Sequence, residues 1–221
     1  GGKWKNMMIQ KHIGYKIWND SFPEDTLPVI FRIDETEKLP SGFTFTADKG
    51  CVVMEAPHIY SKQNSAEGSW TLIEDMGRTL GGVALMPYDV PVDGAKLTYR
   101  MEIPSDVKKV TVHVATKSTL AFHDKDGHSY RVGFKGAEAV DRCFNSRLNE
   151  DPENVYSVYY PTVAKRVAVE KIELSLPEGT SVYDLEIQPL DPGIVFEKII
   201  VDFGGYKDSY LMGNESAYIR K

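Results

Sequence analysis

The amino-acid sequence predicts an all-β protein, an antiparallel β-sandwich of the jelly-roll type preceded by a short N-terminal helical segment. From about residue 29 onward, apolar and polar residues alternate in short segments such as 97–103, and a period of two is that of a half-buried strand. Turn signals such as Asp93-Gly94 and Glu178-Gly179 separate these segments. Almost no helical pattern lies among them, and short strands at this spacing indicate two packed antiparallel sheets.

The first 28 residues differ from the rest of the chain. Apolar residues recur there at helical spacing, which predicts a short amphipathic helix. These residues are Trp4, Met7, Met8, Tyr15 and Trp18. A proline-punctuated stretch over residues 21–28 follows and favours a linker. We therefore expect a helical segment with its linker at 1–28 and a β-sandwich module at 29–221.

Within the module, the strand pattern recurs along the whole length. Most segments alternate, whereas residues 194–203 form a longer run that is apolar on both faces. The expected strands are 43–46, 51–56, 69–73, 82–86, 97–103, 110–114, 130–134, 172–176, 183–187 and 194–203.

Composition excludes several classes of function. The formal net charge is −6, from 26 Lys and Arg against 32 Asp and Glu, so a nucleic-acid binder is not expected. No apolar run approaches the roughly 20 residues that span a bilayer, so no membrane partner is expected. Only Cys51 and Cys143 are present, which excludes a disulfide framework and leaves open whether the two pair.

Motifs for catalysis or metal binding are missing. The chain lacks the Gly-x-Ser-x-Gly, Ser-x-x-Lys and His-Glu-x-x-His signatures and a phosphate loop, and no pair of carboxylates stands out. The segment from His123 to His128 contains Asp-x-Asp-Gly, part of a calcium loop, but lacks its further acidic ligands. A solvated hairpin tip is the better interpretation. We expect no catalytic residue, no metal site and no cofactor.

Two stretches offer candidate carbohydrate-binding residues. Trp70 on a strand and Arg78 in the glycine-arginine turn after it would supply an aromatic face and a fork of donors, which suit sugar rings and hydroxyls. The alternative is that Trp70 fills the core and Arg78 closes a local ion pair. Tyr156 and Tyr160, with Tyr159 between them, are the second candidate platform, although aromatic-rich strands are commonly only well packed.

Three blocks of sequence resemble the C-terminal region of glycoside hydrolase family 115, the xylan α-1,2-glucuronidases. The first is Gly2–Tyr15, with Lys3-Trp4-Lys5-Asn6-Met7-Met8 at its start, and the second is the stretch from Trp70 to Thr79 with Met-Gly-Arg-Thr at its end. The third and most specific is the closing strand motif from Asp191 to Asp202, followed by Gly204-Gly205. Order and approximate spacing hold over nearly the whole chain.

The resemblance implies a role for the module. In that family the catalytic barrel lies N-terminal to everything present here, so residues 1–28 would be the remnant of a helical domain. The module would be a non-catalytic accessory part whose partners are the catalytic and helical domains of the parent enzyme. Two alternatives stay open: a carbohydrate-binding module for xylan or glucuronoxylan, including its acidic decorations, and a ligand-free dimerisation domain that forms a homodimer. The family also implies a periplasmic or extracellular location in a bacterium.

A weaker similarity links the module to carbohydrate-binding module families 6 and 35. Met54-Glu55-Ala56, the strand at 97–103 and the last strand ending at Asp202 carry it. Those modules are galactose-binding-like jelly rolls that often hold a structural calcium with acidic residues near the first and last strands. Pro57 stands here where such an acidic residue is expected, so we expect the module to fold without calcium.

Overall fold

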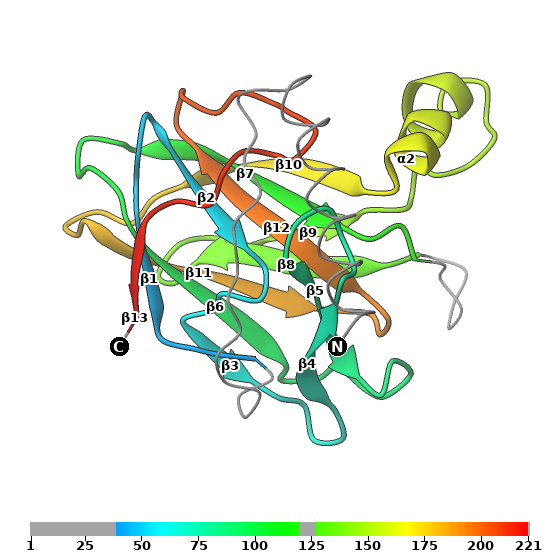
Figure 1. Cartoon of the computed structure of the whole chain (residues 1–221), viewed down its shortest axis with the longest axis horizontal. Coiled ribbons are helices and arrows are strands. Elements are labelled where there is room, and N and C mark those ends of the chain that lie inside the picture. Colours follow the sequence, from blue (N-terminus) through cyan, green and yellow to red (C-terminus); the bar gives the residue numbers. More distant parts are fainter. Residues whose placement is uncertain (1–38, 120–126, 221) are drawn as a thin grey trace, which may run out of the picture.

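Two β-sheets packed face to face form the protein in the computed structural model, which describes residues 39–119 and 127–220 (Figure 1). The all-β sandwich predicted from the sequence is confirmed. The N-terminal helix and linker predicted at 1–28 lie outside the described residues, as does the loop segment 120–126 that carries His123.

The first sheet, called sheet A, contains seven strands among the described residues. Its path is β13-β1-β6-β11-β8-β9, and β3 pairs with β6 beside β1. The pairing of β1 with β6 is parallel, and the other strand pairings in this sheet are antiparallel among the described residues. The bounds are β13 Tyr218–Arg220, β1 Phe43–Thr46, β6 Lys96–Glu102, β11 Val182–Pro189, β8 Ser129–Phe134, β9 Val140–Cys143 and β3 Ser61–Gln63.

The second sheet, called sheet B, has six strands within the described ranges. Its path is β10-β7-β12-β5-β4, and β2 pairs with β12 alongside β5. A bulge at Glu197 shifts the register of β12 against β7. The bounds are β10 Ala168–Ser175, β7 Lys109–Thr116, β12 Val195–Asp202, β5 Gly81–Met86, β4 Ser69–Glu74 and β2 Cys51–Glu55.

A short helical segment interrupts the β structure between β9 and β10. It consists of a π-helical turn η1, Val155–Tyr159, and the helix α2, Tyr160–Lys165, which projects at one end of the sandwich (Figure 1). The aromatic-rich strand considered for these tyrosines is therefore not formed. Pro161 lacks a backbone N–H and suits the first turn of a helix but not the middle of a sheet.

The core lies between the two sheets and follows the alternation of the sequence. On β6, Leu97, Tyr99 and Met101 are fully buried, while the residues between them face outward. A second, smaller cluster covers the outer face of sheet B, where Val53 and Ile200 pack with Met212 from the chain after β12. Residues 203–217, which join β12 to β13 and are called here the strap, therefore cover part of the outside of sheet B.

Candidate functional site

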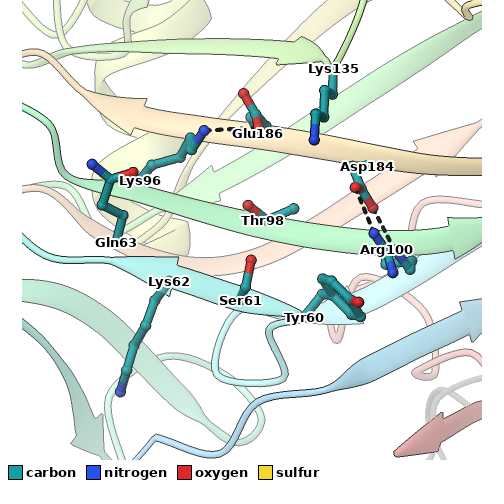
Figure 2. A pocket seen from close by; sticks show the side chains of 10 residues that line it. All are labelled: Tyr60, Ser61, Lys62, Gln63, Lys96, Thr98, Arg100, Lys135, Asp184 and Glu186. Carbon is teal, nitrogen blue, oxygen red and sulfur yellow. Dashed lines mark hydrogen bonds and ion pairs between the residues drawn. The ribbon is translucent and has the colours of Figure 1, made fainter. Parts of the chain in front are cut away.

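A polar groove of about 290 Å³ lies on the outer face of sheet A (Figure 2). It runs across β3, β6 and β11 and reaches Lys135 at the end of β8. Because alternate residues of β6 fill the core, Lys96, Thr98 and Arg100 turn outward and form its floor. This volume is close to the lower end of the range for small-molecule sites, which suits a ligand the size of a sugar unit or two.

Arg100 is the most tightly held cation of the groove. Its Nε and Nη2 donate to the two carboxylate oxygens of Asp184 at 2.7 and 2.8 Å, a bidentate pair between directly opposed residues of β6 and β11. The hydrogen bond to Asp184 is the main reason that the pKa of Arg100 is raised. The guanidinium carbon also lies 3.5 Å from the centre of the Tyr60 ring. Asp184 and Arg100 together hold the ring of Tyr60 at the edge of the groove (Figure 2).

A second ion pair crosses the same two strands. The ammonium of Lys96 lies 2.9 Å from a carboxylate oxygen of Glu186, and both side chains are mostly shielded from solvent. Lys135 points into the groove from β8, near Glu186 and Asp184 in Figure 2. With amide and hydroxyl groups of Gln63, Ser61 and Thr98 also in the lining, the groove offers donors and acceptors beside an aromatic ring. Sugars bind through this combination of groups.

Trp70 lies in the core, as in the alternative to a sugar-binding role. Only 4% of the side chain is exposed, and its ring packs 6.3 Å from that of Phe196 between centroids. The indole N–H donates to the backbone carbonyl of Gln63 at 2.8 Å. The ring therefore presents no open face to a ligand.

Arg78 joins three segments of the chain and does not close an ion pair within the described residues. It donates to the backbone carbonyl of Tyr210 on the strap and, at 2.7 Å, to that of Lys165 in α2. Its guanidinium carbon lies 4.1 Å from the centre of the Tyr210 ring. Two N–H donors and one face of the Arg78 guanidinium are therefore occupied by the protein, and the side chain links the β4–β5 loop to α2 and to the strap.

Tyr156 and Tyr160 are brought together at the surface on the helical segment. Tyr156 is 80% exposed and Tyr160 is 50% exposed, and their ring centres are 5.7 Å apart with the planes tilted by 48°. Val163, one turn further on, is 52% exposed. Positions i, i+4 and i+7 share one face of a helix, so these three residues form an exposed apolar stripe, called here the helix stripe.

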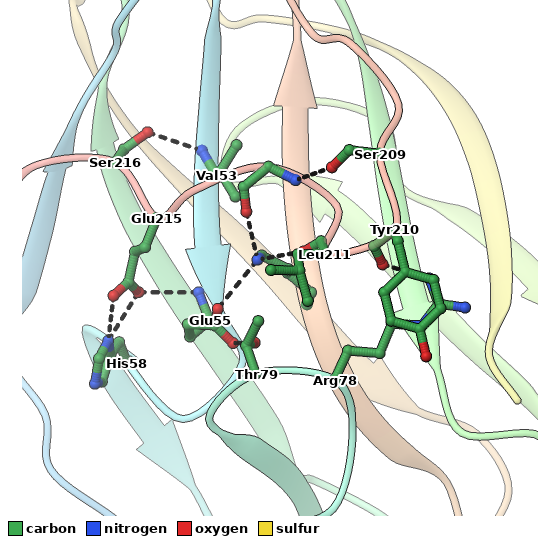
Figure 3. A network of polar contacts seen from close by, with 12 residues as sticks. Val53, Glu55, His58, Arg78, Thr79, Ser209, Tyr210, Leu211, Glu215 and Ser216 are labelled. Carbon is green, nitrogen blue, oxygen red and sulfur yellow. Dashed lines mark hydrogen bonds and ion pairs between the residues drawn. The ribbon is translucent and has the colours of Figure 1, made fainter. Parts of the chain in front are cut away.

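A buried polar network lies under the strap, on the far side of sheet B from the core (Figure 3). The ammonium of Lys198 lies 3.1 Å from a carboxylate oxygen of Glu55 and donates to the carbonyls of Leu211 and Gly213 at 2.8 and 2.7 Å. Both charged side chains are 1% exposed. Glu55, the last residue of β2, therefore has its charge balanced by a lysine of the protein.

Glu197, the bulge residue next to Lys198, is a buried carboxylate with a raised pKa. Burial is the main cause of the rise, which the nearby Lys117 and Arg78 partly oppose. Its side chain is 3% exposed, and the ammonium of Lys117 lies 3.8 Å from one oxygen. A buried and weakly paired carboxylate makes the stability of the protein depend on pH.

Sequence reasoning missed the residues of the groove. Arg100 lies in a segment correctly predicted to be a strand, but its partner Asp184 is 84 positions later. Tyr60 belongs to no periodic pattern, because the neighbouring strand β3 is exposed along its whole length. One feature of the sequence could have indicated the groove, namely the charged residues at alternate positions of 96–102 and 182–188. They indicate a polar outer face only when it is known that these two strands pair.

The described residues offer no metal site and no disulfide. Within 39–119 and 127–220, no group of three or more His, Cys, Asp or Glu side chains gathers closely enough to hold a metal ion. Neither Cys51 nor Cys143 forms a disulfide bond. No helix in the described part of the chain is long and apolar enough to cross a bilayer.

Comparison with known families gives one match. The family described as the glycosyl hydrolase family 115 C-terminal domain matches residues 44–215. This match confirms the resemblance to the family, and it includes the second and third sequence blocks but not the first, Gly2–Tyr15. A search of curated protein sequences gives no significant match.

Solved structures similar to the chain include two enzymes and a carbohydrate-binding module. The family GH115 4-O-methyl-α-glucuronidase BtGH115A, with specificity for decorated arabinogalactans, is 18% identical at a TM-score of 0.49 over 65% of this chain. The chain spans 17% of the length of that protein. The C-terminal CBM6 of the laminarinase LamC from Zobellia galactanivorans is 10% identical, with a TM-score of 0.43 over 69% of this chain and 98% of the module. The GH26-CBM35 β-(1,4)-mannanase of Podospora anserina is 11% identical, with a TM-score of 0.42 over 73% of this chain and 29% of that protein.

Proposed function

The chain belongs to the glycosyl hydrolase family 115 C-terminal domains, and from this we propose that it is a non-catalytic accessory module that contacts polysaccharide for an enzyme resembling a xylan α-1,2-glucuronidase. The module would support the substrate site of that enzyme from outside its catalytic domain. The compartment proposed with it is the periplasm or the exterior of a bacterial cell, where such substrates are met.

The groove on sheet A is the observation that carries this proposal. It holds an aromatic ring, Tyr60, whose position is fixed by the bidentate Arg100–Asp184 pair. It also offers hydroxyl, amide and charged groups on a rigid sheet, so that little ordering is needed when a sugar binds. Rings and planar hydrogen-bonding groups on a fixed surface favour carbohydrate over an apolar ligand.

Binding of xylo-oligosaccharides with and without glucuronic acid side chains, measured by calorimetry on the purified chain, tests the proposal. We expect binding that Tyr60→Ala weakens roughly two- to tenfold, because the substitution removes the aromatic face. Tyr156→Ala is the matched variant, since it removes a more exposed tyrosine outside the groove and should leave the affinity unchanged. Loss of binding in Tyr156→Ala alone would move the site to the helix stripe, and absence of any binding would contradict the proposal.

A second candidate function, docking on the rest of the parent enzyme, is favoured by the helix stripe. None of the residues of η1 and α2 is buried, yet Tyr156, Tyr160 and Val163 share one face. An apolar stripe at i, i+4 and i+7 is a common way for a helix to enter a groove of another protein surface. Light scattering across concentrations separates this function from homodimerisation, because a dimer would form from the purified chain alone.

A further inference from the structure

Two of the four cations that line the groove of sheet A, Lys62 and Lys135, make no ion pair within the described residues. Lys96 pairs with Glu186 at 2.9 Å and Arg100 pairs with Asp184 at 2.7 Å. Lys135 points into the same groove, and it makes no ion pair within the described part of the chain. The ammonium of Lys62 at the rim points away from the other groove residues in Figure 2 and lies near a backbone carbonyl.

With Lys62 directed away at the rim, the remaining groove residues carry three positive and two negative charges, although the chain as a whole carries −6. The two carboxylates are held by partners on neighbouring strands, so they are not available to Lys135 at ion-pair distance. Arg100 also keeps donors that Asp184 does not use, because a guanidinium has five N–H groups and Asp184 accepts from two. An anion placed beside Lys135 would meet an unpaired ammonium next to a fixed guanidinium.

We propose that Lys135 forms a subsite for a single anionic substituent, a carboxylate or a sulfate, on a sugar chain bound in the groove. This inference rests on the proposed function, since it assumes that the groove binds carbohydrate. It adds that the ligand is negatively charged and that Lys135 binds the charged group. The ring of Tyr60 would contact the sugar backbone, while Lys135 at the opposite strand would contact the substituent.

The charge balance also limits the density of charge on the ligand. One unmatched cation suits one isolated acidic group on an otherwise neutral chain. A densely charged polyanion would place further anions against Asp184 and Glu186, and like charges at short range repel. The preferred ligand is thus a sparsely decorated polysaccharide and not a polyuronate.

The experiment compares three oligosaccharides of the same backbone on the purified chain: one with a single glucuronic acid side group, the methyl ester of that compound, and one with a single sulfate in place of the acid. We expect the acid to bind roughly three- to tenfold more tightly than its neutral ester, with a difference that shrinks as salt is added. Lys135→Gln should abolish this difference, because the variant has no ammonium to pair with the acid. Lys109→Gln, the same change on β7 of sheet B, should keep the difference.

Each outcome decides between the two levels of the inference. Equal binding of acid and ester by the unmodified chain, or an acid preference that survives Lys135→Gln, overturns the subsite and leaves the proposed function standing. Tighter binding of the sulfate than of the carboxylate supports the subsite and shows that the substituent it prefers is a sulfate. If no oligosaccharide binds, the proposed function and the subsite fail together.

Discussion

Lys198 is buried at a place where a lysine is rarely tolerated. Its ammonium is surrounded by oxygen atoms, one from Glu55 and two from the carbonyls of Leu211 and Gly213. The hydroxyl of Thr79 donates to the second oxygen of Glu55, so that the carboxylate has two partners. The energy of the arrangement depends on every partner being present, because a buried ion without its counter-ion loses hydration and gains nothing in return.

Lys198→Met should therefore lower the free energy of unfolding by about 3–5 kcal/mol, since it leaves Glu55 buried and unpaired. Denaturant unfolding followed by fluorescence measures the change. The double variant Glu55→Met with Lys198→Met should be less destabilised than the single variant, because no isolated charge remains. If the double variant is as unstable as the sum of both single variants, the ion pair is not the cause.

At this scale, sequence patterns predicted where a side chain points but not which partner it meets. The alternation on residues 97–103 correctly assigned Leu97 and Tyr99 to the inside. The same pattern could not show that Arg100 faces Asp184, because strand pairing across 84 residues is decided by the packing of the whole sandwich. Trp70 was ambiguous for a related reason: an aromatic residue on a strand suits both the core and a sugar platform.

At the scale of elements, a side chain from the sandwich contacts the C-terminal end of helix α2. Arg78 in the β4–β5 loop donates to the carbonyl of Lys165, in the last turn of the helix, and to that of Tyr210 on the strap. The last carbonyls of a helix lack partners within it, and a guanidinium satisfies them well. One side chain thus ties the helix, the strap and the β4–β5 loop together.

Arg78→Ala should release this attachment. We expect faster amide hydrogen exchange in residues 155–166 and a loss of about 1–3 kcal/mol of stability for the two hydrogen bonds to the charged group. Arg131→Ala, which removes an exposed pair with Asp141 on the other sheet, is the matched control and should leave exchange in that segment unchanged. Unchanged exchange in Arg78→Ala would show that other contacts hold the helix.

The elements that the sequence did not predict share a physical property. β3 and β13 are exposed along their whole length, and no residue of β9, η1 or α2 is buried. Hydrophobic periodicity detects an element only where one face is buried, so elements without a buried face leave no pattern. The ten predicted strands all correspond to observed ones because each contributes side chains to the core.

For the whole molecule, stability should fall as pH rises through the titration of Glu197. Burial raises the pKa of this carboxyl in the folded protein above its ordinary value of 4.5, so the folded state binds the proton more tightly than the unfolded state. The stabilisation is present below pH 4.5 and is lost as pH rises through the raised pKa. The free energy of unfolding measured against pH for the unmodified chain and Glu197→Gln isolates the effect, because the variant should lack this decline.

His113 changes the stability of the protein with pH in the opposite direction to Glu197. Burial, followed by the nearby Lys171, lowers its pKa below 6.5, so its contribution is present above pH 6.5 and is lost as pH falls through the lowered value. The difference curve between the unmodified chain and Glu197→Gln removes this term, since His113 is common to both. A difference that does not change between pH 4 and pH 8 would contradict the role assigned to Glu197.

The central position of β12 has a consequence for how the chain folds as it is made. β12 pairs with β7 on one side and with both β2 and β5 on the other, so three earlier strands of sheet B have no central partner until residue 202 has left the ribosome. The sheet cannot grow strand by strand in order of synthesis. Its formation is a late step dominated by contacts distant in sequence, which are slow to form. During translation, β4 can pair with β5 and β10 with β7, but β2 lacks its sheet partner, and β5 and β7 each keep one unpaired edge until β12 is made. Unpaired strand edges in an incomplete chain are prone to aggregation.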